Sequence, residues 1–239
     1  MKKYFSVFEM IARSSIYKVL LVLTGMIAVE AAYFYHTMQY PGGILFEEYI
    51  EQSEFALIFK ITYILVTAIL VFPGMNLGSM QSYTLKRLRI KGNYVFFLQA
   101  LYNFLAYMVL WGTQLVMVLA CVAMYQSKMP DAVLWTNQSL LFIFYKNAFL
   151  YSLFPLESLV GWFVLAMTGI MSASATAEFT RRQRKGKFGF ELLFLVVSVL
   201  IYFPRELGYE ITFFVVVVGV LYLVLVTRWI RERGGEVNE

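Results

Sequence analysis

The sequence predicts an all-α membrane protein in which a single transmembrane domain occupies residues 1–239. Hydrophobic residues make up 60% of the chain and aromatic residues 18%, whereas soluble domains contain roughly 45–50% apolar residues. The mean hydropathy is +0.68, and the apolar residues form long runs between short charged segments. Such runs cross a bilayer as helices, because a helix satisfies its own backbone hydrogen bonds where lipid offers none.

The cations lie mainly on one side of the predicted membrane. Four precede the first apolar run, four lie in 86–91, five in 181–187 and three in 228–233, so sixteen of the twenty share that side. Because short cytosolic loops carry an excess of Lys and Arg, we predict six spans with both termini in the cytosol. The net charge of +5 therefore reflects the cations that fix the orientation of the chain in the membrane, and we expect no nucleic-acid partner.

The elements follow one another in a simple order. Residues 1–18 predict a helix lying in the cytosolic interface, because Tyr4, Phe8 and Ile11 share one side of it. The first span has 17 residues, or roughly 26 Å, which suits a slightly thin bilayer core. Pro73 should kink the second span, because proline removes a backbone hydrogen bond. The six predicted spans cover about residues 19–35, 55–80, 94–125, 156–177, 188–203 and 211–227.

Residues 128–155 form the largest region that is not predicted to span the membrane. This region is rich in aromatic side chains, which gather at membrane interfaces. Its uncharged run, 132–145, has 14 residues, which is too short for a comfortable span. We therefore predict an outer helix before the fourth span, which either lies in the interface or re-enters the membrane.

Four polar side chains within the spans are candidates for a substrate path, namely Glu30, Gln99, Asn103 and Gln114. The last three lie within an arc of about 60° on the third span, at 100° per residue. They either form hydrogen bonds between helices or line a route through the membrane. Glu30 lies in the outer half of the first span. Because an ionised carboxylate at mid-membrane costs about 2.5–3.5 kcal/mol, its presence there requires a reason, which is either a structural role or a place on that route.

A short basic segment separates the second span from the third. Residues 83–93 carry four cations and no acid, and Leu85, Leu88 and Ile90 can lie on one apolar side. This pattern predicts a cytosolic loop that docks onto a partner protein. The alternative is binding to anionic lipid headgroups alone, which attract each Lys or Arg by about 1 kcal/mol.

The chain lacks the motifs of the common enzymes. It contains no G-x-x-x-x-G-K-[ST] phosphate loop, no H-E-x-x-H motif and no G-x-S-x-G motif,. With one cysteine, Cys121, and one histidine, His36, a single chain cannot form a disulfide or a His/Cys metal cluster. We therefore expect no catalytic residue, metal site or bound cofactor in this chain, and a role as a conduit, a binding protein or an anchor.

Several local sequences resemble those of small bacterial permeases. They are Tyr83-Thr-Leu-Lys-Arg-Leu, Gln99, Asn103, Trp111-Gly-Thr-Gln114, Phe154-Pro-Leu-Glu157 and the basic segment 181–187. With six spans, an N-terminal interfacial helix and an outer helix, the chain is similar to the membrane subunit of a type 2 ATP-binding-cassette (ABC) exporter from Gram-positive bacteria. The resemblance covers nearly the whole chain.

The resemblance implies a permease in the bacterial cytoplasmic membrane. Its implied partners are a cytosolic ABC ATPase, which binds ATP and Mg, and a second membrane subunit, either identical or similar. The basic loop is then the coupling helix that sits in a groove of the ATPase. Its implied contact residues are Tyr83, Thr84, Leu85, Lys86, Arg87, Leu88 and Arg89.

Two other functions fit the same sequence. One is the substrate-binding membrane subunit of an energy-coupling-factor importer, which docks its partner through small-residue helix faces such as Gly169, Ala173 and Ala177. The other is a membrane assembly protein with no role in transport. The residues do not select a substrate among peptides, lipids, drugs and ions.

Overall fold

The fold is entirely helical over the part of the chain that the computed structural model describes. That part comprises residues 2–39, 46–75, 92–128, 137–156 and 158–183, with the single positions 196, 199, 219, 222 and 223. No β-strand occurs among these residues, which confirms the predicted all-α class. Three of the described helices are long and apolar enough to cross a membrane, in agreement with a membrane protein.

Three predicted features fall mainly or wholly outside the described residues. The predicted spans 188–203 and 211–227 are represented only by the single positions, and the basic segment 83–89 is not described. The prediction of six spans therefore stays a prediction, as does the orientation of the termini.

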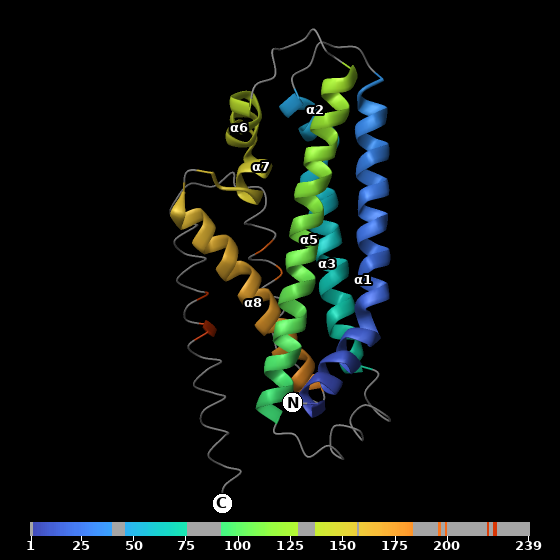
Figure 1. Ribbon diagram of the computed structural model, residues 1–239, viewed down its shortest axis with the longest axis vertical. Helices are drawn as coiled ribbons and strands as arrows, with labels where there is room; N and C mark the ends of the chain where they lie inside the picture. Colours follow the sequence, from blue (N-terminus) through green and yellow to red (C-terminus); the bar gives the residue numbers. More distant parts are fainter. Residues whose placement is uncertain are drawn as a thin grey trace, which may run out of the picture.

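Helix α1 (Lys2–Thr37) combines the predicted interfacial helix and first span in one continuous helix of 36 residues. Its first turns lie at an angle to the remainder (Figure 1). The hydroxyls of Ser14 and Ser15 bond back to the carbonyl oxygen of Ile11, at 2.7 and 3.4 Å. Such back-bonding by serine bends helices, so α1 can change direction and stay one continuous helix.

Helices α3 (Phe55–Met75) and α5 (Gly92–Lys128) occupy the regions of the predicted second and third spans, although residues 76–80 of the second span lie outside the described residues. Helix α3 begins at the predicted residue, and Pro73 lies in its last described turn. Helix α5 has 37 residues, or about 55 Å at 1.5 Å per residue, whereas a bilayer core is about 30 Å thick. The absence of any charge from residue 92 to 127 leaves nothing to end the helix at the membrane surface.

Three short helices gather at one end of the bundle (Figure 1). They are α2 (Phe46–Gln52), α6 (Asn137–Lys146) and α7 (Ala148–Leu153). Helix α6 lies in the region predicted for the outer helix, 132–145, of which residues 132–136 are outside the described residues, and α7 is a second short helix after it. They are separate because Asn147 caps α7, its side-chain oxygen accepting from the backbone N–H groups of Phe149 and Leu150 at 3.0 and 3.1 Å,.

Helix α8 (Leu159–Gln183) occupies the region of the predicted fourth span, 156–177, and its helical limits differ from those of the predicted span. It begins later because Ser158 is its N-cap, with the hydroxyl accepting from the backbone N–H of Gly161 at 2.9 Å,. It ends later because Arg181 and Arg182 form its last turn, where cations stabilise a helix dipole. The first two arginines of the basic cluster are therefore helical.

The long helices form one bundle with a continuous core. Helices α1, α3 and α5 run side by side, and α8 crosses α5 and α3 obliquely (Figure 1). Buried core side chains include Phe34 of α1, Val66 of α3 and Leu110 of α5. Large apolar side chains such as Leu21 and Val116 are 72% and 67% exposed on the outer faces. Helices that are apolar both inside and outside the bundle suit a surface that faces lipid.

Candidate functional site

All four predicted path residues lie inside the bundle. Glu30, Gln99, Asn103 and Gln114 are 0%, 4%, 1% and 0% exposed, respectively. The polar stripe of α5 therefore faces other helices and not the outer surface. The seven predicted coupling residues, 83–89, lie outside the described part of the chain.

The stripe on α5 meets different helices at different heights. Asn103 donates a hydrogen bond from Nδ2 to the hydroxyl of Thr176 on α8, at 2.8 Å. Gln114, three turns further along α5, lies beside Glu30 of α1. Because α8 crosses α5 obliquely (Figure 1), it covers the stripe at Asn103, and α1 covers it at Gln114. Asn103 thus joins helices, as one of the two predicted roles requires.

Glu30 and Gln114 form a buried polar pair between α1 and α5. The amide of Gln114 is the hydrogen-bonding neighbour of the Glu30 carboxyl. None of the four polar atoms of the two side chains reaches regular hydrogen-bond geometry with any described residue. The buried thiol of Cys121, also on α5, is within electrostatic range of Glu30. This pair is the part of the core in which polar groups are least satisfied.

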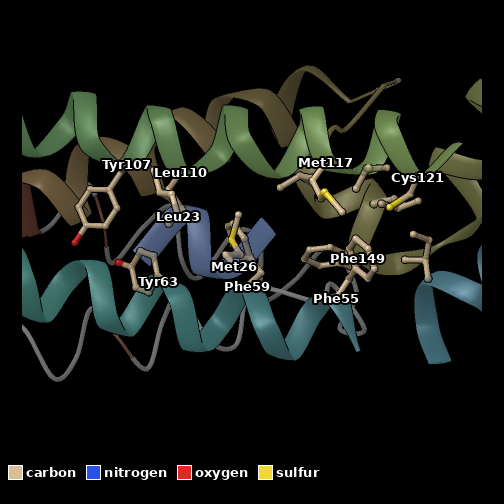
Figure 2. Packing of buried hydrophobic residues seen from close by; sticks show 14 of the residues in the cluster. Leu23, Met26, Phe55, Phe59, Tyr63, Tyr107, Leu110, Met117, Cys121 and Phe149 are labelled. Atoms are coloured by element: carbon tan, nitrogen blue, oxygen red, sulfur yellow. The ribbon is translucent and has the colours of Figure 1, made fainter. Parts of the chain in front are cut away.

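Two tyrosines form the second polar cluster, where α3, α5 and α8 meet. The rings of Tyr63 and Tyr107 stack with centroids 5.3 Å apart and an interplanar angle of 28°. The Tyr63 hydroxyl bonds with Ser172 Oγ at 2.9 Å, and the Tyr107 hydroxyl bonds with Thr67 Oγ1 at 2.8 Å. Figure 2 shows both rings projecting into the space between α3 and α5. These contacts join three helices through side-chain hydroxyls.

A cavity of about 250 Å³ lies beside the tyrosine cluster. It is lined by side chains of α3, α5 and α8 and by Val199. Aromatic rings dominate its wall, including Trp111 and Trp162, whose centroids lie 6.5 Å apart in an edge-to-face arrangement. The polar groups of the wall are the hydroxyls of Tyr63, Tyr107, Thr168 and Ser172. These hydroxyls already bond with one another or with backbone carbonyls, so the wall suits an apolar or aromatic group.

None of the four predicted path residues lines this cavity. Sequence reasoning selected amides and carboxyls and passed over tyrosine and serine hydroxyls. One signal was present, because Thr168, Ser172 and Thr176 recur every four residues and so share a face of α8. What the sequence could not show is that this face meets Tyr63 and Tyr107 on two other helices.

The small residues of α8 are buried within the chain. Ala173 and Ala177 are 2% and 0% exposed, and a Cβ at Gly169 would lie 3.4 Å from the ring of Phe104 on α5. Gly219, in the predicted sixth span, lies against Met171 of α8. This side of α8 therefore contacts other parts of the same chain.

The arginines at the end of α8 also have partners. Arg182 Nε lies 3.2 Å from Glu178 Oε1, and Arg181 Nη1 lies 3.9 Å from Glu178 Oε2. The guanidinium of Arg181 stands 6.0 Å from the ring centroid of Phe96 on α5, which is a cation–π distance. Glu178 itself is 1% exposed. The two ion pairs lie within the last turns of α8, and the contact of Arg181 with Phe96 joins this end of α8 to α5.

Among the described residues, no three His, Cys, Asp or Glu side chains come together as metal ligands would. The arrangement instead offers an aromatic cavity, a tyrosine cluster and a buried carboxyl–amide pair inside a helical bundle. The chain matches no family model, no curated protein and no solved structure.

Proposed function

We propose that this chain is the membrane subunit of an ATP-driven transporter of the ABC exporter class, in the cytoplasmic membrane of a bacterium. A separate cytosolic ATPase binds ATP and Mg, and a second membrane chain, identical or similar, completes the transporter. The observation that carries the proposal is the cavity between α3, α5 and α8. A cavity whose walls belong to three helices changes shape when one helix moves, which a conduit needs and an anchor does not.

The position of the basic segment supports a coupling role. Residues 76–91 connect α3 to α5, and both helices contribute side chains to the cavity wall. A partner that pushes on 83–89 therefore acts on two walls of the cavity through continuous helices. Tyr63 and Tyr107, which stack across these helices, are the contacts that such a movement would change first.

The coupling role is tested by reversing charge in the segment. We expect Lys86→Glu combined with Arg87→Glu to abolish co-purification of the ATPase and to leave membrane insertion intact, because a groove that accepts cations repels acids. The matched control is Lys128→Glu, a cation at the opposite end of α5, which should retain the ATPase. Unchanged co-purification in the double variant, with reduced binding to anionic vesicles, would show that the segment only anchors the chain to headgroups.

The cavity wall predicts a substrate with an apolar or aromatic portion. Leu165→Trp adds volume inside the cavity and should reduce transport while retaining the ATPase. Its control is Phe163→Trp, because Phe163 lies two residues away and is 51% exposed on the outer face of α8. Equal transport by both variants would show that the cavity is not part of the substrate route.

The importer alternative is less well supported by the packing of α8. Docking through Gly169, Ala173 and Ala177 requires a face that other chains can reach, whereas Ala173 and Ala177 are buried within this chain. Purification of the native complex decides among the alternatives. Two ATPase copies with two membrane chains support the exporter, and a complex without any ATPase excludes both transport proposals in favour of an assembly protein.

A further inference from the structure

Glu30 and Gln114 are the most deeply buried pair of polar side chains without regular hydrogen bonds in the described part of the chain. Both are 0% exposed, and both oxygens of Glu30 and both polar atoms of Gln114 lack hydrogen-bond partners among the described residues. The two side chains are neighbours across the interface of α1 and α5. A native protein seldom leaves four such atoms unsatisfied, so their juxtaposition requires an explanation.

Among the described residues, the charged groups near Glu30 do not supply a counter-ion. Helix α1 packs against α2, α3 and α5. The charged side chains described on these helices are Glu48 and Glu51 of α2 and Lys60 of α3, and the described side chains within the span of α5 carry no charge. None of these three charged groups acts on the Glu30 carboxyl. The remaining titratable neighbour is the thiol of Cys121, which offers no positive charge. An ionised carboxylate here would be an isolated charge among apolar helices, which is costly.

The chemistry of the pair matches a neutral carboxyl. A protonated Glu30 offers one O–H donor and one carbonyl acceptor, while Gln114 offers N–H donors and one carbonyl acceptor. The two groups can therefore satisfy each other with a small rotation of either side chain. An ionised Glu30 only accepts, so the carbonyl oxygen of Gln114 would be left without a donor.

A metal ion fits the same residues less well. Hard cations such as Ca²⁺ and Mg²⁺ take about six or more oxygen ligands, and Glu30 and Gln114 together supply three side-chain oxygens. Among the described residues, Glu30 belongs to no group of three or more His, Cys, Asp or Glu side chains that could hold a metal ion. The proton is the cation that needs the fewest partners.

We propose that Glu30 and Gln114 form a proton-binding site within the bundle, in which Glu30 holds a proton at neutral pH and Gln114 is its hydrogen-bond partner. The site lies between α1 and α5, so release of the proton places an isolated charge in that interface and weakens the packing of the two helices. Proton binding is a property of this chain alone and does not depend on the proposed transport function.

Infrared spectroscopy of the purified full-length chain in lipid tests the site. At neutral pH the wild-type protein should show the C=O stretching band of a neutral carboxyl, which shifts in heavy water, whereas exposed carboxyl groups are ionised. Glu30→Gln, which has the shape of the neutral acid, should lose this band. The matched control is Glu178→Gln, which should retain the band because Glu178 is paired with Arg182. A band of equal intensity in wild type and Glu30→Gln would overturn the proposal.

Two further measurements separate the roles of the partners. Gln114→Leu should move the band to higher wavenumber, because the carboxyl loses its hydrogen bond; an unchanged position would refute the role of Gln114. Replacing choline by sodium in the buffer should leave the neutral-carboxyl band unchanged. If sodium instead converts this band into the bands of an ionised carboxylate, the site binds a metal ion and not a proton.

If Glu30→Gln does not fold, modification of the wild-type chain by a hydrophobic carbodiimide should locate the neutral carboxyl at Glu30. A chain modified elsewhere but not at Glu30 would contradict the proposal.

Discussion

Tyr63 on α3 stacks on Tyr107 on α5, and the hydroxyl of each tyrosine bonds to a different helix from its own. The Tyr63 hydroxyl reaches Ser172 on α8, and the Tyr107 hydroxyl reaches Thr67 on α3. The two rings therefore connect α3, α5 and α8, which line the cavity together with Val199. Their position makes them the most direct link between helix packing and the shape of the cavity.

Removal of either tyrosine hydroxyl should destabilise the bundle modestly. We expect Tyr63→Phe and Tyr107→Phe each to lower the free energy of unfolding by about 0.6 kcal/mol, the average for hydrogen bonds between membrane helices, and by no more than about 1.7 kcal/mol. The loss stays small because Ser172 and Thr67 retain their own bonds to backbone carbonyls, at 2.7 and 2.8 Å. Unfolding in mixed detergent and SDS measures it.

The control for this pair is Tyr17→Phe, since Tyr17 is 77% exposed. It should change stability by less than about 0.5 kcal/mol. The double variant Tyr63→Phe with Tyr107→Phe should deviate from additivity, because the rings are in contact. Strict additivity would mean that the two hydroxyls act independently.

Asn103 should contribute to stability through its bond to Thr176. Asn103→Leu removes an interhelical hydrogen bond of 2.8 Å and should cost about 0.6–1.7 kcal/mol. A double-mutant cycle with Thr176→Val isolates the bond, and its coupling energy should be positive. Thr113→Val is the control, because the Thr113 hydroxyl is exposed and bonds only within its own helix, to the carbonyl of Val109. A coupling energy of zero would show that Asn103 contributes by shape alone.

Substitution by alanine should have different effects on stability at two glycines of α8. A Cβ at Gly161 would lie 2.6 Å from Cβ of Pro155, so Gly161→Ala should destabilise by about 1–3 kcal/mol through overpacking. A Cβ at Gly169 would meet the Phe104 ring at 3.4 Å, which is ordinary contact. Gly169→Ala should therefore be neutral or gain up to about 1 kcal/mol of helix propensity. Thermal unfolding of the two variants in one detergent compares them, and similar losses would contradict the packing described here.

The ion pair at the end of α8 should be needed for its stability. Arg182→Ala leaves the buried Glu178 carboxylate without its 3.2 Å partner, and we expect a loss of about 1.5–3 kcal/mol, typical of hydrogen bonds to charged groups. Arg13→Ala, at an exposed position of α1, should change stability by less than about 0.5 kcal/mol. If Arg182→Ala and Glu178→Gln together cost less than the sum of their separate costs, the two side chains interact, whereas simple addition would argue against a direct interaction.

Sequence reasoning predicted the helices far better than their meeting points. The start of α3 and the unusual length of α5 followed from the positions of charges, because a charged residue is what ends an apolar span. The continuation of helix α8 to Gln183, past the predicted span, did not follow from the sequence, because arginines favour the last turn of a helix as much as the loop after it. Periodicity placed Gln99, Asn103 and Gln114 on one face, and the structure buries all three.

The sequence by itself determined that the chain is helical, apolar and suited to a membrane, because composition and the spacing of charges decide which solvent each segment can tolerate. Only the tertiary structure decided that one face of α5 meets α8 at Asn103 and α1 at Gln114, and that a cavity forms beside Tyr63 and Tyr107. The physical reason is that a repeat of 3.6 residues fixes the direction of each side chain on its own helix. The angle at which two helices cross, set by the side chains packed between them, then decides which partner each side chain meets.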